Sequence, residues 1–473
     1  MENEHRQAQA GGTALTAGSP WKLLLLFSLP LMVGNIFQQL YTVVDTAVVG
    51  KVLGVDALAA LGAVDWLNWL TLGMIQGFTQ GFSILMAQRF GAQDYQKLRQ
   101  AVANAIVLSI LCASVLTAGS QALAGSVVDL LQTPGDIRPI SMAYLRILFG
   151  GLPVVMAYNL SASILRALGD GRTPLIAMAA ASAVNISLDF LFVMGFRWGV
   201  RGAAAATILA QCLAAGCCIY RICHTQALQL TRADWRLSGS LCGRLMWLGI
   251  PMAFQNTIIA VGGMIIQTIV NGFGVAFIAG YTAANKLYGI LEVAATSYGY
   301  AMTTYAGQNL GAGKTHRISQ GIRAGLVIAL ATSLVIAGLM IGLGRWILSC
   351  FISAGVEQGP RALETGYRYL CLMSACLPAL YILHVVRSCI QGLGNTVLPM
   401  VSGMAEFVMR TAGALLLPAV MGEAGVMAAE VSAWFGADLI LVPSYLLVMR
   451  RIRRRSGAGA LSSGAPPSAG QHF

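Results

Sequence analysis

Seven carboxylates interrupt stretches of sequence that are otherwise long and apolar. A charged side chain is costly inside hydrocarbon, so an acid in such a stretch is a candidate for ion binding, proton transfer or substrate contact. The seven acids are Asp45, Asp65, Asp189, Glu292, Glu406, Glu430 and Asp438. We expect the chemistry of the protein to depend on some of them.

The first half of the chain places two of these acids where they could form one site. Asp45 lies on one predicted helix, and Asn185 and Asp189 are four residues apart on one face of another. Both helices cross the membrane in the same direction, so Asp45 and Asp189 are expected at comparable depth. Residues that share the helix face of Asp45 are Gly34, Gln38 and Tyr41.

Thr207 is expected at a similar depth on the next helix, with Gln211 one turn below it. Two carboxylates, an amide oxygen and a hydroxyl suit a hard monovalent cation. The same two carboxylates could instead share a proton, because crowded buried acids resist joint ionisation. Predicted residues of a substrate cavity are Gln38, Tyr41, Asn159, Gln211, Glu292 and Glu430.

In the second half, Glu406 and Arg410 are four residues apart and are interpreted as a structural ion pair. Asp65 is expected near the outer end of its helix, where it is solvated or capped.

Motifs for several other functions are absent from the sequence. It contains no GxxxxGK[ST] motif, which excludes the usual phosphate-binding loop of an ATP-driven pump. Cys217, Cys218, Cys223 and His224 cluster near a helix end, but their spacing fits no zinc site. We find no nucleophile and base in a catalytic arrangement. The sequence therefore predicts neither an enzyme nor a protein with a cofactor or a transition metal.

The composition indicates a polytopic membrane protein. Hydrophobic residues make up 57% of the 473 residues, charged residues 10%, and the mean hydropathy is +0.71. A soluble domain carries about a quarter charged residues. Twelve spans are predicted, at 22–48, 57–88, 96–124, 136–166, 173–196, 199–222, 243–270, 276–309, 317–345, 362–392, 397–420 and 424–449.

The net charge of +12 is distributed unequally across the membrane rather than forming a surface for nucleic acid. On the side of the two termini we count 19 Lys and Arg residues, against 7 on the other side. We expect the protein to lie in the plasma membrane. The positive-inside rule then places both termini in the cytoplasm. The basic run near Arg450 is interpreted as an anchor at anionic lipid.

The second half of the chain repeats the first. Pro30 recurs as Pro251, a shift of 251 − 30 = 221, and the sequence AQRFGA recurs as GQNLGA with a shift of 220. Other recurring residues are Tyr144, Pro153, Gly169 and Pro174, shifted by 225, and Gly199 and Gly202, shifted by 223. Six spans separate the two copies, so they run in the same direction and are related by an axis along the membrane normal. We expect a cleft between them.

The repeat gives the expected organisation of the chain. It comprises a disordered tail at 1–19, a first lobe at 20–223, a cytoplasmic linker at 224–243, a second lobe at 244–455 and a second disordered tail at 456–473. The fold class is all-α, with six helices in each lobe.

Several segments together resemble the multidrug and toxic-compound extrusion (MATE) family. They are VVDTAVVGKVLG in span 1, AQRFGA after span 2, RALGDGRTP after span 4, NISLD in span 5, GVRGAAAAT in span 6 and GQNLGAG after span 8. The resemblance covers nearly all of residues 20–450. It implies twelve helices in two lobes around a central cavity, and export of organic cations in exchange for sodium or protons.

The resemblance also implies that Asp45, Asn185, Asp189 and Thr207 form the cation site of the first lobe. Some family members use an acid on span 7, but that span reads FQNTIIAVGGMII here. Two other functions stay open: a lipid-linked oligosaccharide flippase of the same superfamily, and an intramembrane enzyme. Expected partners are small organic cations, a monovalent cation and membrane lipid, with no nucleic acid, and the expected state is a monomer.

Overall fold

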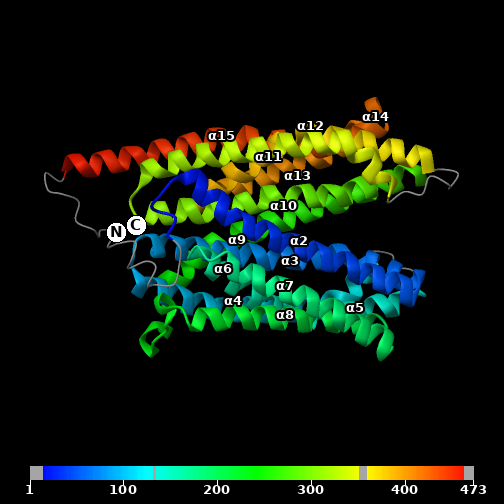
Figure 1. Ribbon diagram of the computed structural model, residues 1–473, viewed down its shortest axis with the longest axis horizontal. Coiled ribbons are helices and arrows are strands. Elements are labelled where there is room, and N and C mark those ends of the chain that lie inside the picture. The colour runs from blue at the N-terminus through cyan, green and yellow to red at the C-terminus, as the bar shows by residue number, and fades with distance from the viewer. Residues whose placement is uncertain (1–13, 131–134, 351–358, 463–473) are drawn as a thin grey trace.

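A computed structural model describes residues 14–130, 135–350 and 359–462, and this part of the chain is a bundle of long helices (Figure 1). The first six crossings are α2 (Pro20–Leu53), α3 (Val55–Gly91), α4 (Tyr95–Leu130), the pair α5 (Arg138–Gly150) and α6 (Leu152–Ala167), α7 (Arg172–Asp189) and α8 (Val200–Cys223). The other six are α9 (Gly239–Val270), α10 (Val275–Gly311), α11 (Thr315–Ser349), α12 (Gly359–Gly392), α13 (Val397–Leu416) and α15 (Glu423–Ser462). Short elements between them are η1 (Phe190–Gly195), η2 (Gln226–Leu228), η3 (Arg232–Trp235) and α14 (Pro418–Met421).

The helices are long and apolar enough for a membrane protein. Nine of the described helices are each long and apolar enough to cross a membrane, and α5 and α6 together form a tenth such span. The two remaining long helices, α3 and α10, have 37 residues each, about 55 Å at 1.5 Å per residue. Both run the length of the bundle beside the others (Figure 1). The twelve predicted crossings therefore all correspond to helices of the structure.

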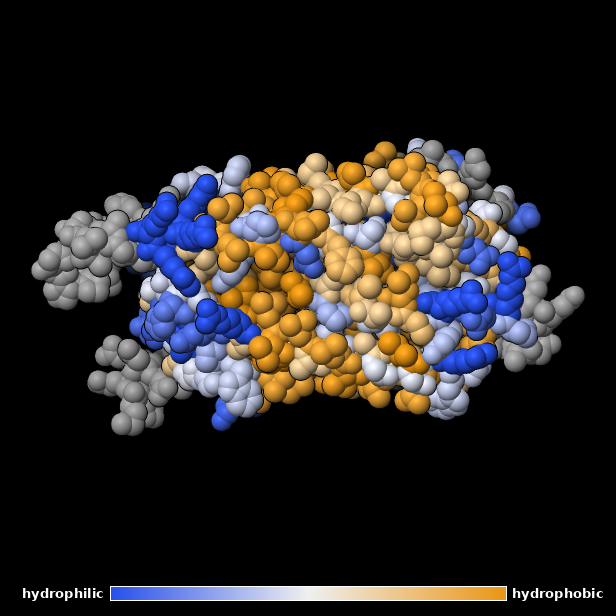
Figure 2. Space-filling model, turned by 90° about the horizontal axis from the view of Figure 1, so that it is seen from above, coloured by the Kyte–Doolittle hydropathy of each residue, from blue (hydrophilic) through white to orange (hydrophobic). Residues whose placement is uncertain are grey.

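The surface shows the same arrangement. Apolar side chains cover the middle of the visible face, and hydrophilic side chains gather at its two ends (Figure 2). Such a band matches the hydrocarbon core with its two aqueous borders. The helix α2 begins and α15 ends at the same end of the bundle, which we call the terminal end (Figure 1).

The predicted span 136–166 is bent rather than straight. It ends as α5 at Gly150 and resumes as α6 at Leu152, with 46° between the two axes. Pro153, in the first turn of α6, has no N–H for a helical hydrogen bond. Gly151 at the break lies against Ile208 of α8, where a Cβ atom would collide with that side chain. The corresponding Pro378 lies inside α12, which remains one helix.

The backbone confirms the sequence repeat at its turns. Glycines with a positive φ angle recur at matching positions of the two halves. Other residues adopt this left-handed conformation only at a cost in free energy. Gly169 has φ 83° and Gly394 has φ 85°, and Gly199 has φ 62° where Gly422 has φ 58°. The two halves therefore share their local geometry as well as their order of helices.

The ends of the chain differ from the expected disordered tails. Leu15, inside the predicted tail 1–19, is 1% exposed and packs in the core of the second lobe. Its N–H donates to Oε1 of Gln308 at 2.8 Å, and its carbonyl accepts from Nδ2 of Asn309 at 3.1 Å. At the other end, α15 continues to Ser462, inside the predicted tail 456–473. The remainder of both predicted tails, 1–13 and 463–473, lies outside the described residues.

The two lobes meet closely at the terminal end. The conserved spacing of the repeat brings Gly91, at the end of α3, against the backbone of Gln308 in α10, and Gly311 against the backbone of Gln88. The Nε2 atom of Gln308 also donates to the carbonyl of Ala167 at 2.9 Å, which joins α10 to the end of α6. These contacts close the bundle at this end.

We expect Gly91→Ala to destabilise the protein because the added methyl group has no room at this crossing. Overpacking costs about 1–3 kcal/mol. Gly119→Ala in α4 is the matched control, since no atom lies within 4 Å of a Cβ there and alanine favours a helix by about 0.5–1 kcal/mol. Thermal unfolding in detergent should show a lower Tm for Gly91→Ala alone. Equal Tm values for the two variants would contradict the close crossing.

Candidate functional site

The two carboxylates predicted for the first lobe lie close together inside it. Asp45 of α2 is 8% exposed, and Asp189 at the end of α7 is fully buried. Their charges are near enough to interact electrostatically. Asn185, one turn before Asp189, is also fully buried. The structure therefore brings together three of the four residues predicted for a cation site.

Several polar atoms of this group have no hydrogen-bond partner within the described residues. They are Oδ1 of Asp45, both side-chain polar atoms of Asn185 and both carboxylate oxygens of Asp189. Buried polar groups in proteins are nearly always satisfied, because burying one without a partner costs free energy. A cluster of such oxygens between helices is therefore suited to hold a proton or a metal cation.

A local irregularity of the helix positions Asp189. Directly after it the chain forms η1, a π-helix of six residues, in which the N–H of Phe196 bonds to the carbonyl of Leu191 at 2.8 Å. Gly202 of α8 lies against Phe192, where a Cβ atom would be 3.0 Å away. Short π-helical turns are often found at functional sites. The sequence predicted a continuous helix over 173–196 and did not indicate this π-helical turn.

Thr207 lies on α8 but makes a different contact from the one predicted. Its hydroxyl donates to the carbonyl of Ala203 at 3.1 Å, within its own helix. Within the described residues it makes no hydrogen bond to Asp45 or Asp189, although its oxygen keeps lone pairs that could accept. Gln211, one turn further, is 8% exposed, and its Nε2 reaches Oη of Tyr41 at 3.5 Å. Tyr41 and Gln211 therefore connect α2 with α8 next to Asp45.

The other residues predicted for a substrate cavity are less closely grouped. Gln38 is half-buried on α2, one turn before Tyr41. Asn159 of α6 is half-buried and donates from Nδ2 to the carbonyl of Val155 at 2.8 Å. Glu292 of α10 belongs to the second lobe, and its Oε1 lies 3.5 Å from Nε2 of His384.

Tyr144 of α5 is a neighbour of the site that the sequence did not assign to it. Its hydroxyl lies within electrostatic reach of Asp45, Asp65 and Asp189, and it packs beside Val48 and Val49 of α2. The available signal was its recurrence in the repeat as Tyr369. That recurrence indicated a structural position and gave no indication of the acids around it.

A buried network of charges lies in the second lobe. Glu406 of α13 accepts from Nη2 of Arg387 at 2.7 Å and from Nη2 of Arg410 at 3.1 Å. The same Nη2 of Arg410 donates to Oε1 of Glu430 at 2.8 Å. The four side chains, which we call the charge quartet, are between 5% and 9% exposed. The predicted pair of Glu406 with Arg410 is present, and the sequence missed Arg387 as its third member.

Glu430 is thus already engaged by a base. A contact between Glu430 and a substrate would have to use its other carboxylate oxygen or displace Arg410. Asp438 of α15 lies within electrostatic reach of Arg387, and its Oδ1 has no hydrogen-bond partner in the described chain.

A profile of the MatE family matches this chain twice, at residues 30–191 and 251–416. The two matches fall on the two lobes. The chain belongs to the MatE family. Among curated proteins it is 30% identical to the probable multidrug resistance protein YpnP of Bacillus subtilis, over 87% of this chain and 91% of the relative. It is also 23% identical to an FAD transporter of Shewanella oneidensis, over 64% of this chain and 68% of that protein.

A solved structure shows the same fold. A crystal structure of MATE in complex with MaL6 superposes with a TM-score of 0.87 at 20% identity, over 93% of this chain and 98% of the other. The predicted twelve-helix architecture and the membership in a family of membrane transporters are therefore confirmed.

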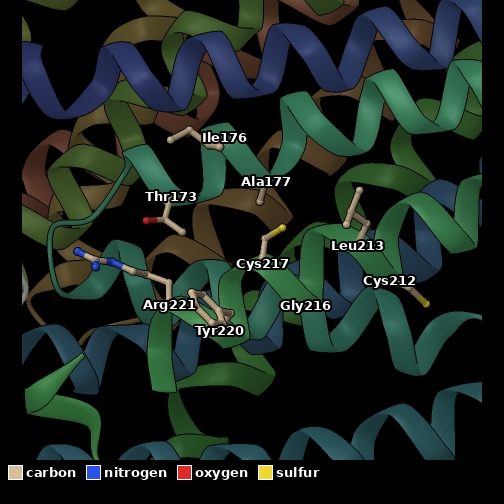
Figure 3. Close-up of a pocket in the computed structure, with 9 residues that line it drawn as sticks. All are labelled: Thr173, Ile176, Ala177, Cys212, Leu213, Gly216, Cys217, Tyr220 and Arg221. Atoms are coloured by element: carbon tan, nitrogen blue, oxygen red, sulfur yellow. The ribbon is translucent and has the colours of Figure 1, made fainter. Parts of the chain in front are cut away.

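One cavity in the described part of this MATE chain is lined by none of the candidate site residues discussed above. It has a volume of about 640 Å³ and lies between α7 and α8 (Figure 3). Its lining combines apolar side chains, among them the exposed Ile176, with Arg221 at one end. The groove faces outward from the first lobe, where lipid surrounds a membrane protein. The described residues contain no group of three His, Cys, Asp or Glu side chains arranged for a metal ion.

We expect Glu406→Gln to destabilise this MATE protein strongly. The substitution keeps the shape of the side chain but leaves Arg387 and Arg410 with one carboxylate fewer in a buried site. Breaking a buried ion pair in this way costs about 3–5 kcal/mol. Thermal unfolding in detergent is the measurement.

The control is Glu423→Gln, which removes a pair of exposed side chains with Arg361 at 3.2 Å. Pairs on the surface contribute about 0–1 kcal/mol. If Glu406→Gln lowers Tm no more than Glu423→Gln does, the interpretation of the charge quartet as structural is wrong.

Proposed function

We propose that this protein exports organic cations across the plasma membrane in exchange for sodium or protons. The observation that carries the proposal is the group of unpartnered oxygens on Asp45, Asn185 and Asp189. A buried carboxylate pair is unstable unless a cation or a proton neutralises it. An ion that binds there in one conformation and leaves in another can couple its gradient to transport.

The conformation supports alternating access. The lobes are closed at the terminal end by the contacts of Gly91 and Gly311. Further along the same helices, Asp65 of α3 and Lys286 of α10 are exposed although both lie within membrane-spanning segments. The two residues are within electrostatic reach of one another. Charged side chains are costly in contact with lipid, so we infer that Asp65 and Lys286 face an aqueous opening toward the end opposite the termini.

The terminal end is the cytoplasmic end in this proposal, so the structure is outward-facing. Basic residues favour the cytoplasm, and they predominate at this end. A cysteine at Thr231, an exposed residue of the linker, should react with an impermeant thiol reagent only from the inside in a cysteine-free background. Reaction from outside intact cells would reverse the orientation.

Acids and aromatic rings are the expected partners of a cationic substrate. A desolvated cation needs negative charge or the face of a ring. The proposed contacts are Gln38, Tyr41, Asn159, Gln211, Glu292 and Glu430, and one carboxylate oxygen of Glu430 is already bonded to Arg410. Both the ion site and these residues belong to one chain, so a monomer suffices.

The test is transport by the purified protein in proteoliposomes. Ethidium serves as the cationic substrate, and a flavin nucleotide serves as an anionic comparator, because one relative is named an FAD transporter. We expect ethidium to accumulate against its gradient under an imposed sodium gradient or an imposed pH gradient, whichever ion the site selects. Transport of the flavin nucleotide but not of ethidium would reject a cationic substrate. Ethidium movement that neither gradient drives would reject the antiport.

We expect Asp45→Asn and Asp189→Asn each to reduce gradient-driven export to the level of protein-free vesicles. An amide has the shape of the carboxylate but cannot neutralise a cation or release a proton. Both variants should fold, since asparagine retains hydrogen bonding. Asp56→Asn, an exposed acid in the first turn of α3, is the control and should export at the wild-type rate. If both site variants export at the wild-type rate, the coupling site must lie elsewhere in the protein.

A further inference from the structure

The two lobes place opposite chemistry at corresponding positions. The repeat pairs Asn185 with Arg410, since 410 − 185 = 225, the shift that also relates Pro174 to Pro399 on the same helices. Thr207 pairs with Glu430 by the shift of 223 that relates Gly199 to Gly422. The matching backbone angles at Gly199 and Gly422 support this register. A base and an acid in the second lobe thus replace an amide and a hydroxyl in the first.

The remaining members of the charge quartet replace small residues. Arg387 corresponds to Ala162, and Glu406 to Ala181, both by the shift of 225. These two alanines are 0% and 3% exposed. The interior of the first lobe therefore has no side-chain cation at these positions, whereas the second lobe has two.

The consequence for charge is simple. Arg387 and Arg410 balance Glu406 and Glu430, so the charge quartet is neutral without any ion from solution. Among the described residues of the first lobe, no ion pair neutralises Asp45 or Asp189. The first-lobe acids therefore need a mobile cation or proton, whereas the acids of the charge quartet are neutralised by cationic side chains.

We propose that Arg410 is a tethered cation, held by Glu406 and Glu430 at the second-lobe position that corresponds to the coupling-ion site of the first lobe. This inference rests on the proposed function of that first-lobe site. The charge quartet consequently exchanges no ion, and the coupling ion is left to the first-lobe site. Arg410 is a positioning residue, because it sets the charge of its lobe without contacting the mobile ion.

The stem of Arg410 packs closely against α9, and titratable groups of three other helices surround its charge quartet. Its Cδ atom would lie 3.4 Å from a Cβ at Gly262 of α9, so the glycine leaves room for the arginine stem. Titratable groups around the charge quartet come from three neighbouring helices. They are Tyr281, Tyr288 and Glu292 of α10, Tyr369 and His384 of α12, and Asp438 of α15. All of them are unchanged in the variants compared below.

The experiment removes the first-lobe site and then alters Arg410. The background is Asp45→Asn/Asp189→Asn, in which no ion is expected to stabilise the first lobe. Melting temperatures are measured over a pH series, and in sodium chloride against choline chloride at constant ionic strength. Anything that binds only the folded state raises Tm as its concentration rises. A background that keeps the wild-type response to sodium or pH would show that the first-lobe site is wrong, whatever the result at Arg410.

In that background we expect Arg410→Asn to create a new dependence on cations. The variant leaves Glu406 and Glu430 with Arg387 alone, an excess of one negative charge. Its Tm, relative to the background, should rise as pH falls or as sodium is added. Arg410→Lys keeps a tethered cation and should show no added dependence. A folded Arg410→Asn variant without this response would overturn the proposal, and so would an equal response in Arg410→Lys.

A double variant decides the matter if Arg410→Asn cannot be purified. Arg410→Asn/Glu430→Gln removes one charge of each sign and restores neutrality. We expect it to be recovered in folded form, with a Tm that does not depend on added sodium. If the double variant is lost like the single one, Arg410 acts through its packing rather than its charge, and the proposal is wrong.

Discussion

Charge inside the hydrocarbon region is the constraint on which the rest of this structure depends. A carboxylate there must be neutralised, and the neutralising partner can be a cationic side chain, a proton or a cation from solution. In the second lobe the partners are side chains, and the result is a network whose four members bond to one another at 2.7–3.1 Å. In the first lobe the acids are left for a partner that can come and go. The same constraint thus produces a rigid element in one lobe and an exchangeable one in the other.

The repeat makes this division possible. Two copies of one helical scaffold keep the same turns, as the left-handed angles of Gly169 and Gly394 show. Because the turns fix the scaffold, the residues between them can diverge in chemistry while the lobes still fit together. The close crossing of α3 and α10 then joins the lobes at the terminal end, where a side chain larger than hydrogen has no room. The two helices can separate at this crossing, but their close backbone contact leaves little room for one to slide along the other.

The helices of this fold could be predicted from the sequence, and the contacts between them mostly could not. Long apolar runs gave the twelve crossings, and spacing of four along one helix gave the pair Glu406 with Arg410. Arg387 was missed because it reaches Glu406 from another helix, which no local spacing reveals. The bend at Gly151 and the π-helix after Asp189 were missed for a related reason. Both depend on how closely α8 packs against the preceding segment.

The same reasoning explains the N-terminal segment. The two predicted tails together are rich in Gly, Ala, Ser and Pro, a composition that predicted disorder because such residues have little apolar surface to bury. The structure instead holds Leu15 through two hydrogen bonds to α10, in which its N–H donates to Gln308 and its carbonyl accepts from Asn309. Partners that are 293 residues apart leave no trace in local composition.

That separation has a consequence for how the chain is made. Leu15 leaves the ribosome long before its partner Gln308 exists, and at about 5–20 residues per second the interval is roughly 15–60 s. During this time the first lobe can insert and pack while the segment before α2 stays unattached. The closure of the terminal end is therefore among the last steps of biogenesis, although it involves the first described residues of the chain. A newly inserted first lobe, with its two buried acids already in place, has to persist in the membrane before the bundle that seals it is complete.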